Sequence, residues 1–545
     1  MASAEYVFKA DEKPAMAGSP YKPRLSPARR GIYFVVGLFL GTCTTLCNGL
    51  VASNLGVISG SIGEYTAQVS WLVAVFLAIN ASANLTLVKA RMQFGIPLVT
   101  ASIVGTYIAA CVLQLLWPTL TTAVIATAIN GLMCATLIAL STYYLMQALA
   151  PSAQPMALII SVGLTQIGSP VARMIPVEFL ASEHWLGLHL LNLGIGMAVL
   201  GVTLAVPLPR SDRASVFSAS DAVVIVLLVS SFLLFAGVLG LGRSYWWTDA
   251  PFLGWMLVAA ISLLVTVVFI ERRRRQPLLQ LEWLGSFDLM RFVAIALLVR
   301  LSLAEQTFGS VGLLSMGGLN NDQLRVLFAC VLVSMLMGIV VACLTLSPKR
   351  IPWQVMVAAL FIATGAYLDS QSTSLTRAPQ LYLSQCLIGF GATLFIGPAL
   401  IFGFLKLFAK GPQYMITLVV LYGASQSIGS LAGSAVMGSY EFIRTQSHIA
   451  SLADSTPITN PLVVARLGIG EALLSSHIAD PEQRQKQSSK LLGQALQQQA
   501  SVLAFNDVFR IVSVLAFGTA MYVFYLQMSA FFLSRIRREP ENVND

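Results

Sequence analysis

The sequence predicts an all-α polytopic membrane protein, and three observations support that prediction. Hydrophobic residues make up 56% of the 545-residue chain and charged residues only 10%, whereas soluble domains carry about 25% charged residues. The mean hydropathy is +0.77, and apolar stretches of about 20 residues, long enough to span a bilayer, recur along the chain. Lys and Arg concentrate in alternate connections between these stretches, as is typical of loops on the cytoplasmic side.

We expect about fourteen transmembrane helices, with a polar tail at each end of the chain. The predicted helices cover residues 32–58, 68–88, 95–116, 119–148, 154–180, 185–207, 221–241, 251–270, 287–315, 324–346, 352–370, 379–408, 412–438 and 508–533. The first tail, 1–30, lacks the apolar core of a signal peptide, so we expect it to be disordered. Both tails group with the basic connections, which predicts cytoplasmic termini and an even number of helices.

The most unusual predicted helix is 287–315, because Arg300 and Glu305 lie within it. A charged side chain near the bilayer centre costs at least about 2.5–3.5 kcal/mol. At about 100° per residue the two side chains point roughly 140° apart, so one face of the helix cannot carry both. Either neighbouring helices neutralise each charge for packing alone, or at least one of the two lines a water-filled path.

Other polar residues also fall within the predicted helices. Arg173 and Glu178 lie near the outer end of the fifth helix. The neutral amides in predicted helices are Asn48, Asn80, Asn84, Asn130, Gln166, Gln385 and Gln426. Such a residue either makes an interhelical hydrogen bond worth about 0.6 kcal/mol or lines a ligand cavity. A cavity that combines a few charges with aromatic and methionine side chains would suit a small amphipathic organic substrate.

One connection, residues 438–507 on the extracytoplasmic side, is much longer than the others. The sequence DPEQ from Asp480 is typical of a helix start, because Asp caps the helix and Pro takes its first position. The stretch that follows is amphipathic, with one side formed by Leu491, Leu492, Ala495, Leu496 and Leu503. This apolar side either packs on the protein itself or docks a partner protein.

Motifs of several other function classes are missing from the sequence. It has no phosphate-binding P-loop, no zinc-ligand pair and no GxSxG motif, so we expect neither an enzyme nor an ATP-driven pump, and no cofactor and no metal. All seven cysteines fall in apolar stretches, which argues against a disulfide framework. The net charge of +9 follows the basic loops, so we expect the lipid bilayer, and no nucleic acid, as the surrounding partner.

Five stretches carry a resemblance to a known family. They are QVSWLVAVFLAINASANLTL (68–87), HWLGLHLLNLGIGM (184–197), PQLYLSQCLIGFGATLFIGPAL (379–400), LYGASQSIGSLAGSAVM (421–437) and QALQQQASVLAFNDVFRI (494–511). Together with the helix number and the long late connection, they resemble the 14-span drug:proton antiporters of the major facilitator superfamily. Within that family the EmrB/QacA-type permeases are the most similar.

The resemblance implies a major facilitator fold with two six-helix halves and an inserted helix pair. The N-terminal bundle would cover 31–207, the inserted hairpin with its cytoplasmic loops 208–286, and the C-terminal bundle 287–535, followed by a cytoplasmic tail at 536–545. It also implies a secondary active transporter of the bacterial inner membrane that exports amphipathic compounds or drugs by proton antiport. A periplasmic membrane-fusion adaptor would dock on the 438–507 connection.

Several signature positions of that family carry other residues here. The arginine of the family's fourth helix matches Thr127, and the acidic residue of its first helix matches Cys47 or Asn48. Two alternatives therefore stay open. The protein is an uptake permease or facilitator in one, and a structural subunit that kept the fold without transport in the other.

The charges that the chain does carry in its predicted helices provide our candidate residues. Glu305 and Glu178 are the candidates for proton coupling, since a membrane carboxylate shielded from water can bind and release a proton. Arg300, Arg173 and the seven amides are the candidates for the substrate cavity. We expect Glu305 to lie in the same cavity as Arg300 and Arg173.

Overall fold

The secondary structure of this chain is helical throughout the part that the computed structural model describes. That part comprises residues 19–23, 25–180, 182–213, 217–274, 277–408, 410–411, 414–457 and 459–536. Apart from connecting segments, it contains one isolated antiparallel bridge, between Pro20 and Ser211. The all-α prediction is confirmed, and the outer parts of the predicted tails, 1–18 and 537–545, lie outside the described residues.

Thirteen described helices are long and apolar enough to cross a membrane, which makes this a multi-pass membrane protein. In the first part of the chain they are α1 (Pro27–Ser53), α4 (Trp71–Phe94), α5 (Ile96–Leu116), α6 (Leu120–Ala148), α7 (Gln154–Met174) and α9 (Ser182–Ala205). The others are α10 (Ala219–Tyr245), α11 (Pro251–Arg273), α15 (Arg325–Leu344), α16 (Ile351–Asp369), α17 (Tyr382–Phe408), α18 (Met415–Ser455) and α20 (Pro481–Ile536). Short helices in the connections include α2 (Leu55–Ile62), α3 (Thr66–Val69), α8 (Val177–Leu180) and α12 (Leu281–Leu284).

The remaining predicted helix, 287–315, is interrupted. α13 (Phe287–Ser302) ends before Leu303, a single π-helical turn, η3 (Glu305–Gly309), follows, and α14 (Ser310–Met316) completes the segment. This interruption is why thirteen continuous helices are found where fourteen were predicted. π turns inside α-helices are frequent at functional sites, and here the turn begins at the completely buried Glu305.

Two large hydrophobic cores stabilise the bundle. One is formed by α1, α5, α6 and α9 around buried residues such as Leu137 and Tyr144. The other is formed mainly by α13, α15, α16, α17 and α18 around Ile388 and Phe395. α7 adds Ile159 to the second core and also packs on α1, so it joins the two groups of helices. α10 packs against α4, α18 and α11.

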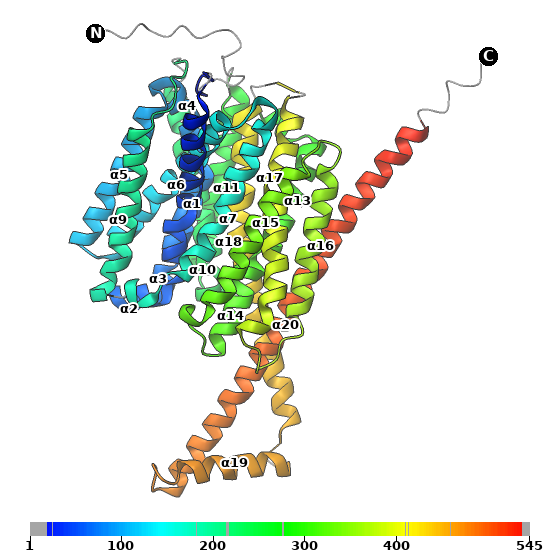
Figure 1. Ribbon diagram of the computed structural model, residues 1–545. Coiled ribbons are helices and arrows are strands. Elements are labelled where there is room, and N and C mark those ends of the chain that lie inside the picture. The colour runs from blue at the N-terminus through cyan, green and yellow to red at the C-terminus, as the bar shows by residue number, and fades with distance from the viewer. Residues whose placement is uncertain are drawn as a thin grey trace.

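Two helices run far beyond the bundle. α18 has 41 residues and α20 has 56, which at about 1.5 Å per residue gives roughly 60 and 85 Å, against a hydrocarbon core of about 30 Å. Figure 1 shows both helices leaving the bundle at the same place and then diverging, with α19 (Pro461–Leu474) spanning the space between their outer ends. We call this part, residues 439–506, the hairpin extension. α1 begins on the opposite face of the bundle.

The hairpin extension corrects one prediction and confirms another. The 438–507 connection was predicted as a loop between two helices, but α18 and α20 continue into it and pair with each other. Asp507 of α20 accepts hydrogen bonds from Arg444 (2.7 Å) and pairs with His448 (2.8 Å), both on α18. The predicted helix start is confirmed, because Oδ1 of Asp480 accepts a hydrogen bond from the backbone nitrogen of Glu482 at 3.1 Å.

The start of the chain is more ordered than predicted over its described residues. Residues 27–30, expected to belong to a disordered tail, form the first turn of α1. Tyr21 is held against the bundle, since its backbone nitrogen donates to the carbonyl of Arg210 at 3.0 Å and its carbonyl accepts from Nε2 of Gln147 at 2.7 Å. The chain is therefore hydrogen-bonded to the folded bundle already at Tyr21, before the first transmembrane helix starts.

This topology makes a labelling prediction. Ser475 lies at the end of α19 and Arg273 at the end of α11, and both are exposed. In a cysteine-depleted protein, we expect Ser475→Cys to react with a membrane-impermeant maleimide added to intact cells. Arg273→Cys should react only after the membrane is permeabilised. Labelling of both positions on the same side would contradict the predicted orientation.

Candidate functional site

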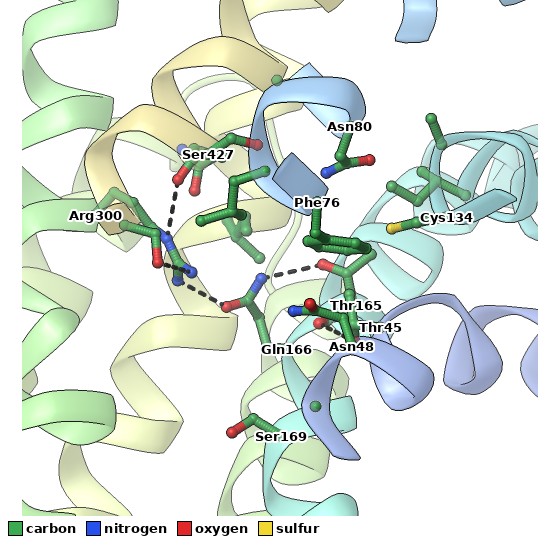
Figure 2. Close-up of a pocket in the computed structure, with 18 of the residues that line it drawn as sticks. Thr45, Asn48, Phe76, Asn80, Cys134, Thr165, Gln166, Ser169, Arg300 and Ser427 are labelled. Atoms are coloured by element: carbon green, nitrogen blue, oxygen red, sulfur yellow. Dashed lines mark hydrogen bonds between the residues drawn. The ribbon is translucent and has the colours of Figure 1, made fainter. Parts of the chain in front are cut away.

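A cavity of about 860 Å³ lies inside the bundle. Its wall combines residues of α1, α4, α6 and α7 with residues of α10, α13, α15, α17 and α18, so helices from both ends of the chain enclose it. Seven of the nine residues predicted for a substrate cavity line it: Asn48, Asn80, Asn84, Gln166, Arg173, Arg300 and Gln426. Figure 2 shows several of these side chains directed into one common space.

Arg300 occupies the centre of the hydrogen-bonding network in this wall. Its guanidinium donates from Nε to the carbonyl oxygen of Gln426 (3.3 Å), from Nη1 to Oε1 of Gln166 (3.1 Å) and from Nη2 to Oγ of Ser430 (3.1 Å). α18 can approach this closely because it has glycine at position 429, where a Cβ would lie 3.1 Å from both Cβ and Cγ of Arg300. The Gly- and Ser-rich sequence of α18 thus makes room for the arginine on α13.

Gln166 connects Arg300 to the other side of the cavity. It lies on α7, accepts the hydrogen bond from Arg300 and donates from Nε2 to Oγ1 of Thr165 at 3.0 Å. Thr45 of α1 in turn donates to the carbonyl of Thr165 at 2.7 Å. Figure 2 shows this chain of contacts running from α13 through α7 towards α1. The two groups of helices are therefore joined, at the level of Arg300, by hydrogen bonds that include no carboxylate.

Arg173 lies in the last turn of α7, closer to the face from which the hairpin extension projects. Nη1 of Arg173 donates to Oδ1 of Asn321 at 2.7 Å, and Asn321 donates from Nδ2 to the carbonyl of Ser53 at 3.1 Å. The guanidinium also lies 5.3 Å from the ring centre of Phe328, within the range of a cation–π interaction. These contacts join α1, α7 and the segment before α15 at this end of the cavity.

Two of the cavity amides have buried polar atoms without a hydrogen-bond partner. They are Oδ1 of Asn48 and Nε2 of Gln426. A buried donor or acceptor that stays unpaired costs about 1–3 kcal/mol. Both atoms are covered by neighbouring groups here, so a rotation of the amide would bring each of them to a ligand in the cavity.

Among the arginine and amide side chains that line the cavity, sequence reasoning missed Arg91, Arg243 and Gln306. The two arginines lie at helix ends and were grouped with the loops, although Arg91 is buried and donates from Nε to the carbonyl of Leu87 at 3.1 Å. Gln306 directly follows Glu305. Its position within a charged transmembrane segment was the available signal.

Two of the predicted site residues, Glu178 and Asn130, do not line the cavity. Glu178 is exposed and lies on α8, outside the membrane helix, because α7 already ends at Met174. The cause is local, since Pro176 keeps the preceding residue extended, and Ile175 has ψ 130°. Asn130 is buried on α6 and does not line the cavity.

Glu305 does not share the cavity with Arg300 and Arg173, contrary to our expectation. Its side chain is completely buried beside Asp369, at the end of α16, and Gln385, on α17. Nε2 of Gln385 lies 3.1 and 3.3 Å from the two carboxyl oxygens of Glu305 and 2.6 Å from Oδ2 of Asp369. A regular helix already places the two side chains about 140° apart, and beyond the end of α13 the Glu305 side chain is directed towards α16 and α17, where Asp369 and Gln385 lie. Gln385, predicted for the cavity, belongs to this second site instead.

The second site, which we call the carboxyl pair, consists of Glu305 and Asp369 bridged by Gln385. Glu305 and Asp369 are also within hydrogen-bonding range of each other, so a negative charge on Asp369 repels one on Glu305. Oδ1 of Asp369 is buried without a hydrogen-bond partner. Asp369 falls at the end of the predicted helix 352–370 and was not among the candidate site residues.

The carboxyl pair is linked to the cavity by one residue. Gln306 lines the cavity and donates from Nε2 to the backbone carbonyl of Gln385 at 3.3 Å. Two carboxylates in contact repel each other strongly in a low-dielectric interior, and a shared proton removes that repulsion. The arrangement can therefore hold a proton next to, but outside, the space in which a ligand would bind. Among the described residues, no group of three or more His, Cys, Asp or Glu side chains could hold a metal ion.

Comparisons with known proteins identify the fold. No protein-family model and no curated protein sequence matches this chain. Among solved structures, the human organic anion transporter MFSD10 is 14% identical, with a TM-score of 0.52 over 90% of this chain and 100% of its own. A structure of a proton-dependent oligopeptide transporter is 11% identical, with a TM-score of 0.55 over 91% and 99% of the two chains. The nucleoside transporter NupG is 13% identical, with a TM-score of 0.51 over 90% and 99%.

At identities this low, the likeness concerns the fold. The chain has the major facilitator fold that the sequence resemblance implied, and membership of the 14-span drug:proton antiporter family stays a prediction.

The carboxyl pair makes a stability prediction. Gln385→Leu removes the amide that donates to both carboxyl groups, so we expect the free energy of unfolding to fall by about 1–3 kcal/mol. Asp369→Asn should be neutral or stabilising, because it removes one of two adjacent acids and supplies an amide donor in its place. Thermal unfolding of the purified protein measures both, with Gln498→Leu at an exposed position of α20 as the control. A Gln385→Leu protein as stable as the control would contradict a bridging role for this amide.

Proposed function

We propose that this protein is a secondary transporter that moves small amphipathic organic compounds through its central cavity. The observation that carries the proposal is the 860 Å³ cavity enclosed by helices from both groups, with seven of its predicted polar residues in the wall. A volume of that size fits a drug-sized molecule. The shared fold with known transporters supports the same function.

The composition of the cavity wall supports an amphipathic substrate. Aromatic and methionine side chains supply apolar surface: Phe76, Tyr143, Phe308, Phe328, Phe404, Tyr422, Met146, Met335 and Met415. Between them lie the amides and arginines described above, which can orient a polar head group. Pockets that combine a large apolar lining with a few placed polar groups are typical of small-molecule sites.

Proton antiport is the coupling that the carboxyl pair supports best. The sequence has no nucleotide-binding motif, so an ion gradient is the available source of energy. The pair can take up a proton, and Gln306 connects it to the cavity in which the substrate would bind. Binding of a proton at the pair and of substrate in the cavity would then influence each other through α13, η3 and α17.

Export with an extracytoplasmic adaptor is the direction that the hairpin extension supports. α19 exposes a row of apolar side chains at the tip of this extension, among them Leu462 (79% exposed), Ile469 (62%) and Leu473 (72%). Exposed apolar side chains in such numbers on one short helix are typical of a protein-binding surface. A periplasmic membrane-fusion adaptor that covers α19 would place the outlet for the substrate beside a conduit, as an exporter of the inner membrane needs.

The transport proposal predicts a proton flux that depends on substrate. The test uses inverted membrane vesicles that hold a proton gradient and a pH-sensitive dye. We expect that adding naphthylacetate, naphthylethanol or naphthylethylamine lets protons leave the vesicles through the wild-type protein, for at least one of the three compounds. Glu305→Gln and Asp369→Asn should abolish this release, because each variant leaves only one titratable carboxyl group in the pair. Gln498→Leu serves as the control.

Several outcomes would redirect this proposal. Release that is equal in Glu305→Gln vesicles would exclude the pair from coupling. Substrate flux without proton release would favour a facilitator or an uptake permease. The absence of any flux would favour a structural subunit that has kept the fold.

The adaptor proposal predicts a partner contact at α19. A photoreactive amino acid in place of Ile469 should crosslink in the native host to a single-span membrane protein with a large extracytoplasmic part. The same amino acid at exposed Val436, which lies on α18 within the bundle, should not. The triple variant Leu462→Ser, Ile469→Ser and Leu473→Ser should abolish co-purification of that partner without lowering thermal stability. Crosslinks to a second copy of this chain alone would refute the adaptor.

A further inference from the structure

We infer that the cavity selects anionic amphipathic molecules, specifically organic carboxylates with an aromatic or aliphatic body. This inference rests on the proposed transport function and names its substrate class. The wall of the cavity, as far as the described residues form it, contains four charged side chains, and all four are arginines: Arg91, Arg173, Arg243 and Arg300. No aspartate, glutamate, lysine or histidine is among the described residues that line it.

Arg300 is the strongest part of this argument, because its charge is solvated by neutral groups. Its three hydrogen-bond acceptors are the carbonyl oxygen of Gln426, the amide oxygen of Gln166 and the hydroxyl of Ser430, at 3.1 to 3.3 Å. Within the described structure, no salt bridge joins Arg300 to a carboxylate, and the nearby acid on the same segment, Glu305, faces the separate carboxyl pair. A guanidinium keeps its charge in proteins, so it cannot become neutral to relieve this cost.

Two further arginines of the wall also have no carboxylate partner among the described residues. Arg173 is held by Oδ1 of Asn321 and the ring of Phe328, and Arg91 by the carbonyl of Leu87. Arg243 differs, because its Nη2 pairs with Oε2 of Glu441 at 3.1 Å. Three of the four positive charges therefore lack a carboxylate partner in the described part of the chain. Arg91 is buried, and Arg173 and Arg300 are half-buried in the cavity wall. A charge shielded from bulk water without an opposite charge is unfavourable, and an anionic ligand would supply the missing one.

The surroundings of Arg300 fit a carboxylate head group in particular. Nε2 of Gln426 is a buried donor without a partner, and the same residue's carbonyl oxygen accepts from Nε of Arg300. The unpaired donor thus belongs to a residue, Gln426, that is already hydrogen-bonded to the guanidinium of Arg300. A carboxylate has two acceptor oxygens, so it can accept from the arginine and, once the Gln426 amide rotates into the cavity, from that amide as well. The hydrogen bonds from Arg300 to Gln166 and Ser430 go to neutral acceptors and can be exchanged for stronger ones to a carboxylate.

The apolar part of the wall explains why the anion should carry a hydrophobic body. Tyr422 and Met335 line the cavity on the side of α18 and α15, and Phe76 lines it from α4. A small inorganic anion would leave this surface in contact with water. Aromatic or aliphatic carboxylates satisfy both the arginine and the apolar wall.

The experiment compares ligands that share a body and differ in head-group charge. The full-length wild-type protein, purified in detergent, is titrated at neutral pH with naphthylacetate, naphthylethanol and naphthylethylamine, and the Kd of each is measured by calorimetry. We expect naphthylacetate to bind at least about tenfold more tightly than the alcohol, and the amine to bind most weakly. Arg300→Gln should weaken naphthylacetate about tenfold or more and leave the alcohol within about twofold, whereas Arg300→Lys should keep part of the preference.

A matched control on the same helix separates charge in the cavity from charge in general. Arg291 also lies on α13, but it packs on the ring of Phe287 at 4.4 Å and does not line the cavity, so Arg291→Gln should bind naphthylacetate as the wild type does. Equal binding of the acid and the alcohol would overturn the anion inference and leave the transporter proposal intact. Failure of all three ligands to bind would overturn both. A loss in Arg291→Gln equal to that in Arg300→Gln would also overturn the assignment to Arg300.

Discussion

The guanidinium of Arg300 must be solvated by protein groups, and much of the bundle is arranged to do this. From its position on α13 it donates to α18 through Gln426 and Ser430, and to α7 through Gln166. The first contact requires glycine at position 429, which lets α18 approach the side chain. The second joins the two groups of helices across the cavity. Because the interior has few other donors and acceptors of this kind, removal of one acceptor would leave a charge poorly solvated.

The interruption after α13 separates two kinds of charge. Arg300 stays on the cavity side, while the π turn directs Glu305 towards Asp369 and Gln385. If the acid and the arginine met in one space, they would neutralise each other at the site where we propose that the substrate binds. The separation keeps the cavity positive and leaves the carboxyl pair free to hold a proton, with Gln306 between them.

The hairpin extension is formed by the outer ends of two helices, α18 and α20, that also pass through this central region. α18 carries Gln426 and Ser430 in the cavity wall and extends outward to Ser455 as one helix. α20 packs Phe505 and Phe509 against the interrupted segment, where a Cβ at Gly309 would lie 2.6 Å from the ring of Phe509. A protein docked on α19 would therefore act on α18, which contacts Arg300, and on α20, which packs on the π turn that begins at Glu305. This continuity offers a direct route by which an adaptor could sense, or bias, the state of the cavity.

The class of the protein and much of its cavity followed from the sequence, because hydropathy and charge are local properties. A bilayer requires long apolar helices with satisfied backbone groups, so their number and most of their bounds could be predicted. The same reasoning identified polar residues with no reason to face lipid, and seven of nine of these line the cavity.

Tertiary structure alone decided which polar residues meet. Glu305 and Asp369 are 64 positions apart, and their contact depends on a π turn and on the packing of α16 and α17 around Gln385, which no spacing rule encodes. The outer end of α18 was equally hidden, since a polar helix that continues beyond the membrane has the composition of a loop, whereas the start of α20 was predicted from the capping sequence at Asp480. Its order comes from pairing with the other helix, through contacts such as that of Arg444 with Asp507.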